Sequence, residues 1–354
     1  MAGGVGSRFW PMSRISKPKQ FLDVLGVGQS LIKMTYNRFK NICPQENIYI
    51  VTNQIYKDLV KEQLEGITDD CIVTEPARRN TAPCITYANF KIMAKNPEAN
   101  IVVAPSDHLI LKEDEFLRIV NSALDVAKQQ EVLVTLGIKP SYPNTGYGYI
   151  QYDKDDYTTI DKNVKKVKIF TEKPDLEMAK KFIQSGDFLW NAGIFIWSLK
   201  SINTALQTYL PEVYNIFMQG LDNYNTDKEE SFINEIYTSC PSISIDYGVM
   251  EKAGNVYVIP SDFGWSDVGT WNALYQVREK DANGNSIIGK NVMTYDTTNS
   301  IITMPKDKLV VLQGLDGYII VESDNTLMIC KKEEEQRVKQ FLTDVEVKKG
   351  EKYL

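Results

Sequence analysis

Residues 101–136 have the sequence IVVAPSDHLILKEDEFLRIVNSALDVAKQQEVLVTL, and this stretch decides the fold class. The β-branched run at 101–104 is typical of a buried strand and leads into a polar loop at 105–107. Residues 113–130 carry apolar side chains at helical spacing, and 132–136 form a second strand-like run. The order strand, helix, strand predicts an α/β fold.

The same alternation continues on both sides of this stretch. Strand-like runs occupy 48–52 and 71–74, and helical spacing covers 82–95. Residues 140–275 hold more hairpin-like β segments. The repetition predicts a Rossmann-like, doubly wound mixed sheet that is mostly parallel, with helices on both faces. Ligands of such sheets bind beyond the carboxyl ends of the strands, so the loops after strands are the candidate sites.

The pattern changes near the turn-rich segment 281–285. Five short β runs follow, at 286–288, 300–303, 309–312, 318–321 and 327–330, and then a charged helix over 332–342. We therefore predict a catalytic domain over 1–280 and a small β-rich, β-helix-like domain with a terminal helix over 281–354. Stability or contact in a homodimer is the expected role of the second domain.

Composition excludes several functional classes. The 354 residues carry 46 acids against 40 bases, a net charge of −6, which argues against sequence-independent binding of nucleic acid. No apolar run is long enough to span a bilayer, so no membrane contact is expected. The five cysteines form no CxxC pair, and their odd number fits the reducing cytoplasm.

The chain contains a single histidine, His108. Zinc sites with two or three histidines are therefore excluded, as is an HExxH protease. A Ser-His-Asp triad would have to use His108. We expect chemistry based on carboxylates, lysines, backbone amides and a hard metal ion, with His108 in a structural role.

The N-terminal segment is rich in glycine and then in cations. Gly3, Gly4 and Gly6 allow close backbone approach and positive φ. The cations Arg8, Arg14, Lys17 and Lys19 precede the first acid of the chain. Together these features favour phosphate binding, although a glycine-rich turn by itself is more often only a turn. Neither the Walker A pattern nor GxGxxG occurs in this segment.

Two further loops have the composition of a nucleotide site. The segment 75–83 follows a strand and opens a helix, with Asn80 or Thr81 at the N-cap position; a simple helix cap is the alternative reading. Asp107 follows the strand 101–104, where a carboxylate could ligate Mg²⁺ together with substrate phosphates. A lone Asp after a strand is, however, more often a cap or turn residue.

Later loops combine Asn, Asp and Glu with glycines and aromatic side chains, a composition that suits a sugar ligand. They are the segments 144–149, 170–174, 190–195, 246–252 and 264–271. Each aromatic residue would be a core residue by default. Their grouping with polar residues in loops favours a site.

These motifs, in order along the chain, resemble those of sugar-nucleotide pyrophosphorylases of the mannose-1-phosphate guanylyltransferase branch. The signature segment is Ala2 to Arg14 followed by Pro18-Lys19-Gln20-Phe21. Six more matching motifs are 78–83, 105–108, 145–149, 170–174, 190–193 and 264–271. The resemblance covers nearly the whole chain. It implies the nucleotidyltransferase type of fold and the synthesis of GDP-mannose and pyrophosphate from GTP and mannose 1-phosphate.

The resemblance also implies roles for individual residues. The nucleotide would be bound by Ala2, Gly3, Gly4, Gly6, Arg8, Lys19 and Ser106, with Asn80 and Thr81 facing guanine. Mannose would be bound by Gly146, Glu172, Asn191 and Asp246, with Lys173 on its phosphate. Asp107 and Asp267 would be the Mg²⁺ ligands. Arg8, Lys19, Asp107, Lys173 and Asp267 form the implied catalytic set.

The chemistry of this reaction suits a protein with one histidine. The second pKa of a sugar phosphate is about 6, so the nucleophile is already ionised at neutral pH and needs no general base. Cations and a metal must instead offset the repulsion between two polyanions. Another sugar 1-phosphate or nucleotide is the alternative substrate. A non-catalytic regulator that binds GDP-mannose is the alternative of another class.

The start of the chain departs from the family pattern. A hydrophobic strand is expected before the glycine-rich loop, yet only Met1 precedes Ala2. A central strand pairs on both sides, and its loss would leave buried backbone groups unpaired. We therefore expect further apolar residues before Met1 in the native protein. Isomerase activity, which longer relatives carry in an appended domain, is not expected.

Overall fold

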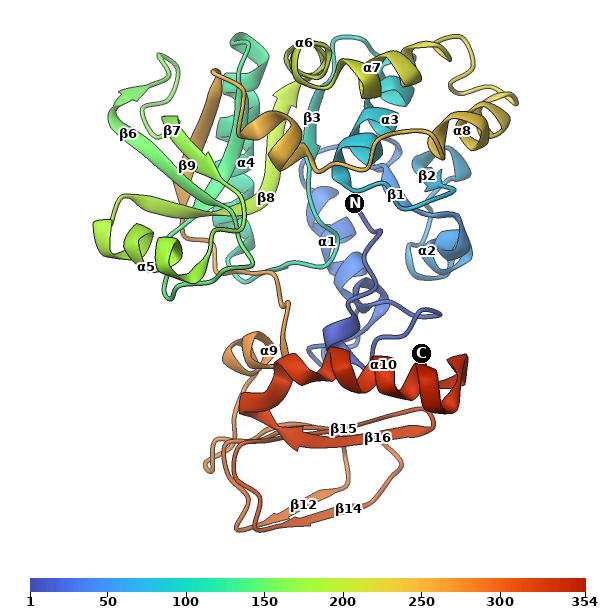
Figure 1. Cartoon of the computed structure of the whole chain (residues 1–354), viewed down its shortest axis with the longest axis vertical. Coiled ribbons are helices and arrows are strands. Elements are labelled where there is room, and N and C mark those ends of the chain that lie inside the picture. The colour runs from blue at the N-terminus through green and yellow to red at the C-terminus, as the bar shows by residue number, and fades with distance from the viewer. The chain divides into compact units, whose positions relative to one another are not determined.

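The computed structural model describes all 354 residues, which form two compact units. The first unit comprises residues 1–3, 38–105 and 110–265, and the second comprises 4–37, 106–109 and 266–354. Figure 1 labels their helices and strands. No helix of the structure has the length and apolar character that crossing a membrane requires.

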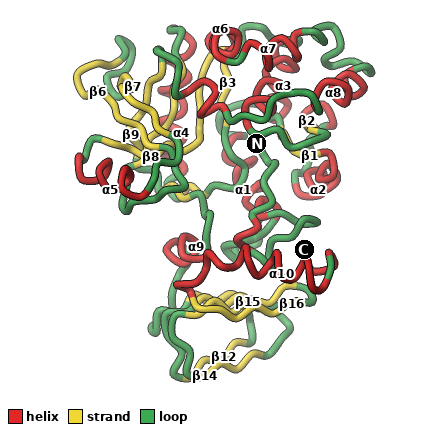
Figure 2. Tube along the Cα trace, in the orientation of Figure 1, coloured by secondary structure: helices red, strands yellow, loops and turns green.

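A six-stranded sheet is the centre of the first unit (Figure 2). Its strands, in the order β3-β8-β5-β9-β7-β6, are β3 (Asn100–Val103), β8 (Phe188–Ser198), β5 (Leu133–Ile138), β9 (Val256–Ser261), β7 (Lys165–Thr171) and β6 (Tyr149–Tyr157). Only β5 and β9 pair in parallel; the other pairs are antiparallel. The predicted mixed sheet is confirmed, but it is less parallel than the strand–helix alternation suggested, because the long strand β8 runs antiparallel between β3 and β5.

A second, parallel sheet in this unit pairs β1 (Ile50–Asn53) with β2 (Ile72–Glu75). The first residues of the chain lie against β1. The N–H of Ala2 donates to the carbonyl of Val51 over 2.7 Å, and the Thr52 hydroxyl donates to the Ala2 carbonyl over 2.9 Å. The N-terminal backbone is therefore fixed at the edge of β1.

Helices cover both faces of the large sheet, as predicted for a doubly wound fold. On one face α4 (Glu113–Gln129) buries Phe116, Ile119 and Val120 against Val134 and Ile196. On the other face, α3 (Thr81–Met93), α6 (Leu199–Tyr209), α7 (Pro211–Met218) and α8 (Glu229–Tyr237) contribute to the larger core. The remaining helices of this unit are α2 (Lys57–Gln63) and α5 (Leu176–Ser185).

The second unit is β-rich. Its four-stranded sheet has the order β11 (Ser286–Ile288), β13 (Ile301–Thr303), β15 (Tyr318–Ser323) and β16 (Thr326–Lys331), and β12 (Val292–Tyr295) pairs in parallel with β14 (Val310–Gln313). Ile302, Met304 and Ile320 form a small buried hydrophobic core among these strands. The short strand β12 was missed in the sequence. The predicted charged helix is a 3₁₀ turn (Lys332–Arg337) followed by α10 (Val338–Lys349).

From Gly4 onward, the glycine-rich N-terminal segment belongs to this second unit. Phe9 and Trp10 pack with Trp271, Ile319 and Val338 in one core, and the Phe9 and Trp271 rings lie 5.0 Å apart. Other elements here are α9 (Trp271–Val277) and the greater part of α1 (Leu31–Phe39). The short strands β4 (Leu109–Ile110) and β10 (Trp265–Ser266) stand where the chain passes from one unit to the other.

Candidate functional site

The glycine-rich turn of the second unit has the backbone that the sequence predicts. Gly6 adopts φ +69°, and a Cβ at this position would lie 2.5 Å from Cβ of Lys19. Only glycine fits both the left-handed backbone and this close approach. The turn is held by the Ser13 hydroxyl, which donates to the Gly6 carbonyl over 2.6 Å.

Lys19 connects three segments of this unit. Its ammonium lies 2.8 Å from Oδ2 of Asp107 and donates to the carbonyls of Asp267 (2.7 Å) and Val268 (3.2 Å). Three partners match the three donors of an ammonium group. Lys19, Asp107 and Asp267, distant in sequence, are thus brought together, and Lys19 holds the segments that carry the two predicted metal ligands.

The charges around Asp107 fix its ionisation. Burial raises the pKa of its carboxyl, but the Lys19 ammonium and His108 outweigh burial and hold the pKa below its usual value. Burial in turn lowers the pKa of His108, against the opposing effect of Asp107 and Asp267. Asp107 is therefore an anion at neutral pH, and His108 is a neutral neighbour.

The residues present fit a magnesium ion bound largely by substrate. The structure holds no group of three or more His, Cys, Asp or Glu side chains that could cage a metal. Mg²⁺ usually needs only one or two carboxylates plus phosphate oxygens and waters. The ionised Asp107 side chain keeps 29% of its surface exposed, so it has lone pairs available beyond those used by Lys19.

The conformation of the Asp267 side chain depends on Gly269, two residues further along the chain. Its Oδ1 accepts the N–H of Gly269 over 2.9 Å, and a Cβ on Gly269 would lie 2.4 Å from its Oδ2. Without that Cβ, the carboxylate can fold back beside its own loop. A glycine is therefore required at position 269.

The other predicted phosphate contacts of this unit differ in their surroundings. The Ser106 hydroxyl is buried and has no hydrogen-bond partner, as expected for a group whose partner is a ligand. Arg8 is exposed and Gly4 has open space around it. Arg14, in contrast, is buried and donates to the Ser323 carbonyl and to Asn325, so it serves the β15–β16 turn rather than a ligand.

Ala2 and Gly3, also predicted to contact the nucleotide, lie in the first unit beside a buried carboxyl group. A Cβ on Gly3 would be 3.7 Å from Oε2 of Glu75. The Tyr237 hydroxyl donates to Oε1 of Glu75, and burial raises the pKa of Glu75 to about 7. Sequence analysis assigned no role to Glu75, although it begins the motif that contains Asn80.

Asn80 caps α3, which confirms the structural part of the prediction for this motif. Its backbone has φ +67°, and its side-chain oxygen accepts the N–H of Thr81 over 2.9 Å. The Thr81 hydroxyl accepts the N–H of Ile245 over 2.9 Å. Both side chains thus have local structural partners, and their contact with guanine stays a prediction.

The predicted sugar residues of the first unit form a connected group. Oε1 of Glu172 lies 2.7 Å from the Lys173 ammonium, and Nδ2 of Asn191 donates to Oδ1 of Asp246 over 2.8 Å. The Asn191 oxygen accepts the Thr135 hydroxyl over 3.0 Å, which orients its amide. A Cβ on Gly148 would lie 2.5 Å from Glu172, so this glycine leaves room for the carboxylate.

Asp246 has an unusual protonation equilibrium. Burial, and then the negative charge of Glu172, raise the pKa of Asp246 to about 7. Burial lowers the pKa of Lys173, but Glu172 and then Asp246 outweigh it, so this pKa is raised overall. With its pKa raised toward neutrality, Asp246 can donate a hydrogen bond when protonated and accept one when ionised, which suits a ligand with hydroxyl groups.

Gly146 is also held locally, because its N–H donates to Oδ1 of Asn144 over 2.7 Å. Aromatic rings adjoin this loop: Tyr147 contacts both Trp190 (5.1 Å between ring centres) and Trp265 (5.3 Å). The clustering of aromatic side chains expected from the sequence is therefore present in the first unit. It places flat apolar surfaces beside the loop of Gly146.

Comparison with known proteins identifies the class. Residues 1–284 match the family model described as nucleotidyl transferase, and residues 290–344 match that of the MannoseP isomerase/GMP-like beta-helix domain. The chain belongs to the nucleotidyl transferase family. The second match agrees with the predicted β-helix-like character of the C-terminal part.

Individual proteins of the family are similar to this chain over most of its length. The chain is 33% identical to mannose-1-phosphate guanylyltransferase of Escherichia coli over 98% of its own length and 75% of the relative's. It is 37% identical to the protein of that name from Sinorhizobium fredii, over 96% of this chain and 65% of the relative. A crystal structure from Thermus thermophilus, titled mannose-1-phosphate geranyltransferase, matches with TM-score 0.86 and 28% identity over 98% of both chains.

Proposed function

We propose that this protein transfers GMP from GTP to mannose 1-phosphate and releases pyrophosphate. Similarity to the guanylyltransferases over almost the entire chain is the observation that carries the proposal. The Lys19–Asp107 pair and the Glu172–Lys173 pair support it, since they supply charges of the kind that phosphates and a sugar require.

The proposed roles follow the two groups of residues. In the second unit, Gly4, Gly6, Arg8, Lys19 and Ser106 bind phosphates, and Asp107 and Asp267 would hold Mg²⁺, which when bound neutralises phosphate charge. In the first unit, the backbone of Ala2 and Gly3 also binds the triphosphate, and Asn80 and Thr81 face guanine. Gly146, Glu172, Asn191 and Asp246 bind mannose, and Lys173 its phosphate.

The reaction needs positioning more than proton transfer. A phosphate oxygen of mannose 1-phosphate attacks the α-phosphorus of GTP, a new P–O bond forms, and the bond to the bridging oxygen of pyrophosphate breaks. The nucleophile, with a second pKa of about 6, arrives ionised. Lys19, Lys173 and Arg8 offset charge on the two polyanions as they approach, and the backbone amides of the glycine-rich segment orient the leaving group.

The test is product formation by the purified protein. GTP, mannose 1-phosphate and MgCl₂ should give GDP-mannose and pyrophosphate in equal amounts, measured by chromatography and by a coupled pyrophosphate assay. A panel of other sugar 1-phosphates and nucleotides should give lower kcat/KM. A higher value for another pair would reassign the substrates. GDP-mannose binding without any pyrophosphate release would favour the non-catalytic regulator.

The proposal includes a homodimer and a cytoplasmic location. Exposed apolar side chains on the β-helix, among them Met293, Leu309 and Val311, support contact with a second copy. Light scattering after size exclusion should give twice the chain mass, and Val311→Lys should reduce it. The five cysteines, all free thiols, favour a reducing compartment.

A further inference from the structure

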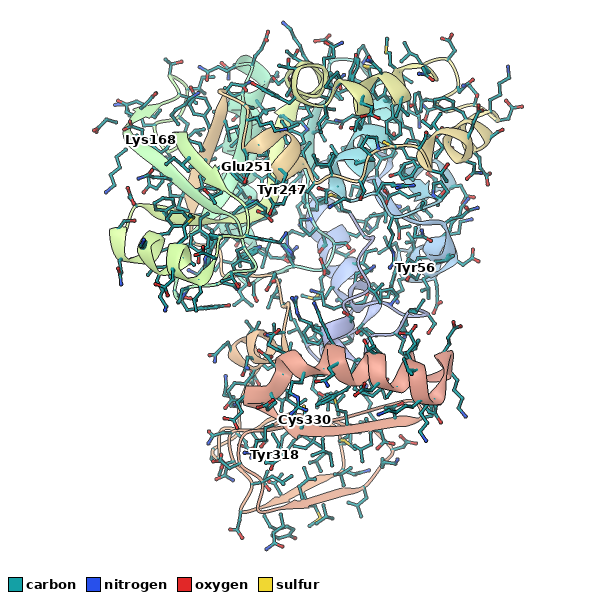
Figure 3. All side chains as sticks on the ribbon, viewed as in Figure 1. Tyr56, Lys168, Tyr247, Glu251, Tyr318 and Cys330 are labelled. Atoms are coloured by element: carbon teal, nitrogen blue, oxygen red, sulfur yellow. The ribbon has the colours of Figure 1, made fainter.

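A π-helical turn, Asp246–Met250, lies next to the predicted sugar residues of the first unit. Two side chains of the segment hold the backbone of Glu172. Oε1 of Glu251 accepts the Glu172 N–H over 2.8 Å, and the Tyr247 hydroxyl donates to the Glu172 carbonyl over 3.3 Å. Figure 3 labels both residues, which come from the same short helical segment. Both polar groups of the Glu172 backbone are therefore held by one turn.

The residue after Glu172 has a strained backbone. Lys173 adopts φ +49°, a left-handed conformation that is unfavourable for a residue with a side chain. Such strain persists only where the surroundings over-determine the conformation. Here the Lys173 N–H donates to the Tyr147 carbonyl over 3.2 Å, and the preceding peptide is held by Tyr247 and Glu251.

The strained turn sets where two side chains point. The Glu172 side chain is only 8% exposed and its carboxylate lies 2.7 Å from the Lys173 ammonium. If Lys173 relaxed to a right-handed or extended backbone, the directions of both side chains would change. The π-helical turn also carries Asp246, whose Oδ1 accepts from Asn191, so one segment contacts both the Glu172 backbone and the Asn191 side chain.

We propose that Tyr247 and Glu251 are positioning residues for sugar-phosphate binding, which hold the strained Glu172–Lys173 turn in its binding conformation. This inference rests on the proposed function, in which Glu172 binds mannose and Lys173 its phosphate. Glu251 is exposed and touches the backbone of Glu172 rather than the side chains assigned to substrate. A π-helix is frequently found at such functional positions.

The experiment measures both substrates separately in the full-length protein. Glu251→Ala should raise KM for mannose 1-phosphate about tenfold and change KM for GTP less than about twofold, because the lost hydrogen bond serves only the Glu172 segment. Glu251→Gln should restore most of the affinity, since its amide oxygen still accepts the N–H. Tyr247→Phe should have a smaller effect in the same direction, about threefold.

Glu230→Ala is the matched control, because Glu230 is an exposed glutamate of the same unit on α8. It should leave both KM values unchanged. Equal rises in both KM values for Glu251→Ala, a failure of Glu251→Gln to restore binding, or an unchanged KM for mannose 1-phosphate would each overturn the inference. A wild-type protein that forms no GDP-mannose would instead refute the proposed function itself.

Amide hydrogen exchange gives a readout that does not depend on turnover. Exchange of the Glu172 amide should become faster in Glu251→Ala than in the wild type or in Glu230→Ala, while the melting temperature stays within about 2 °C. Unchanged exchange at Glu172 would show that Glu251 does not hold this backbone and would also overturn the inference.

Discussion

Asp107 and Asp246 are both partly buried aspartates among the predicted site residues, yet their environments push their pKa values in opposite directions. Asp107 faces the Lys19 ammonium at 2.8 Å, and its pKa is held below the usual value. Asp246 has the carboxylate of Glu172 as its main charged neighbour, and its pKa rises to about 7. Burial acts the same way on both residues, so the neighbouring charge makes the difference.

The difference matches the ligand that each residue is proposed to meet. A metal ion and phosphates require a permanent anion and a permanent cation, which the Lys19–Asp107 pair provides across the working pH range. A sugar hydroxyl can donate or accept, so a carboxyl group that changes protonation near pH 7 remains a suitable partner. The following predictions test this contrast, from the largest expected effect to the smallest.

Asp107→Asn should reduce kcat by at least about 10³-fold, because it removes a proposed Mg²⁺ ligand and the counter-charge of Lys19. Lys19 keeps two carbonyl partners, so the variant should fold with a lower melting temperature. Asp267→Asn should lose turnover with a smaller stability change, since the hydrogen bond from Lys19 goes to the Asp267 backbone carbonyl, which the substitution keeps. Near-normal Mg²⁺-dependent turnover in either variant would remove that residue from the metal site.

Asp246→Asn should be more stable than the wild type at pH 8 and of similar stability at about pH 3, below the unfolded-state pKa. A folded-state pKa of about 7 exceeds the unfolded value, so the wild type loses stability as pH rises from about 4 to 7, and the variant does not. The difference should be on the order of a few kcal/mol. Denaturant unfolding at several pH values measures it. Parallel stability curves of the two proteins would show that Asp246 does not titrate near neutrality.

Lys173→Ala should raise KM for mannose 1-phosphate about tenfold with little change in stability, because the side chain is 54% exposed. Lys19→Ala should instead weaken GTP binding and lower stability, because Lys19 is buried. Separate titrations of the two substrates distinguish the variants. If the two defects were interchanged or identical, the division between nucleotide and sugar residues would be wrong.

Lys168→Ala should change the free energy of unfolding by less than about 0.5–1 kcal/mol and leave activity unaltered. Lys168 pairs with Asp153 at 3.0 Å, nearly the separation of Lys19 and Asp107, but its side chain is 51% exposed. The Lys168→Ala variant therefore measures the effect on stability of losing an ion pair whose lysine is not buried. A loss comparable to that of Asp107→Asn would mean that burial is not the deciding factor.

Local signals in the sequence predicted much of the fold. Apolar spacing placed α4 within a residue of its observed ends, and Asn80 caps α3 as its type and position indicated. β6 extends to Tyr157 through a charged, exposed stretch with no alternating pattern, so its end was not predictable. The antiparallel course of β8 depends on tertiary pairing, which period-two patterns do not encode.

In the candidate site, too, local features could be predicted from the sequence and tertiary contacts could not. The positive φ of Gly6 follows from local composition, and the structure has it. The ion pair of Lys19 with Asp107 joins residues 88 positions apart in sequence, so neither spacing nor composition could indicate it. Glu251 lies in the segment 246–252, but the sequence does not indicate a role for it. Its partner is the backbone N–H of Glu172, a residue of another motif.

The burial of Arg14 and Trp10 in the β-rich unit bears on how this enzyme can be engineered. Arg14 donates to the β15–β16 turn, and the Trp10 indole donates to the carbonyl of Tyr353 over 2.8 Å. The N-terminal segment therefore depends on partners that lie more than 300 residues away in the sequence. A fragment that ends at residue 284, where the nucleotidyl transferase match ends, would leave the buried Arg14 guanidinium and the Trp10 indole without these acceptors, so the catalytic match cannot be isolated from the β-rich part without destabilising it.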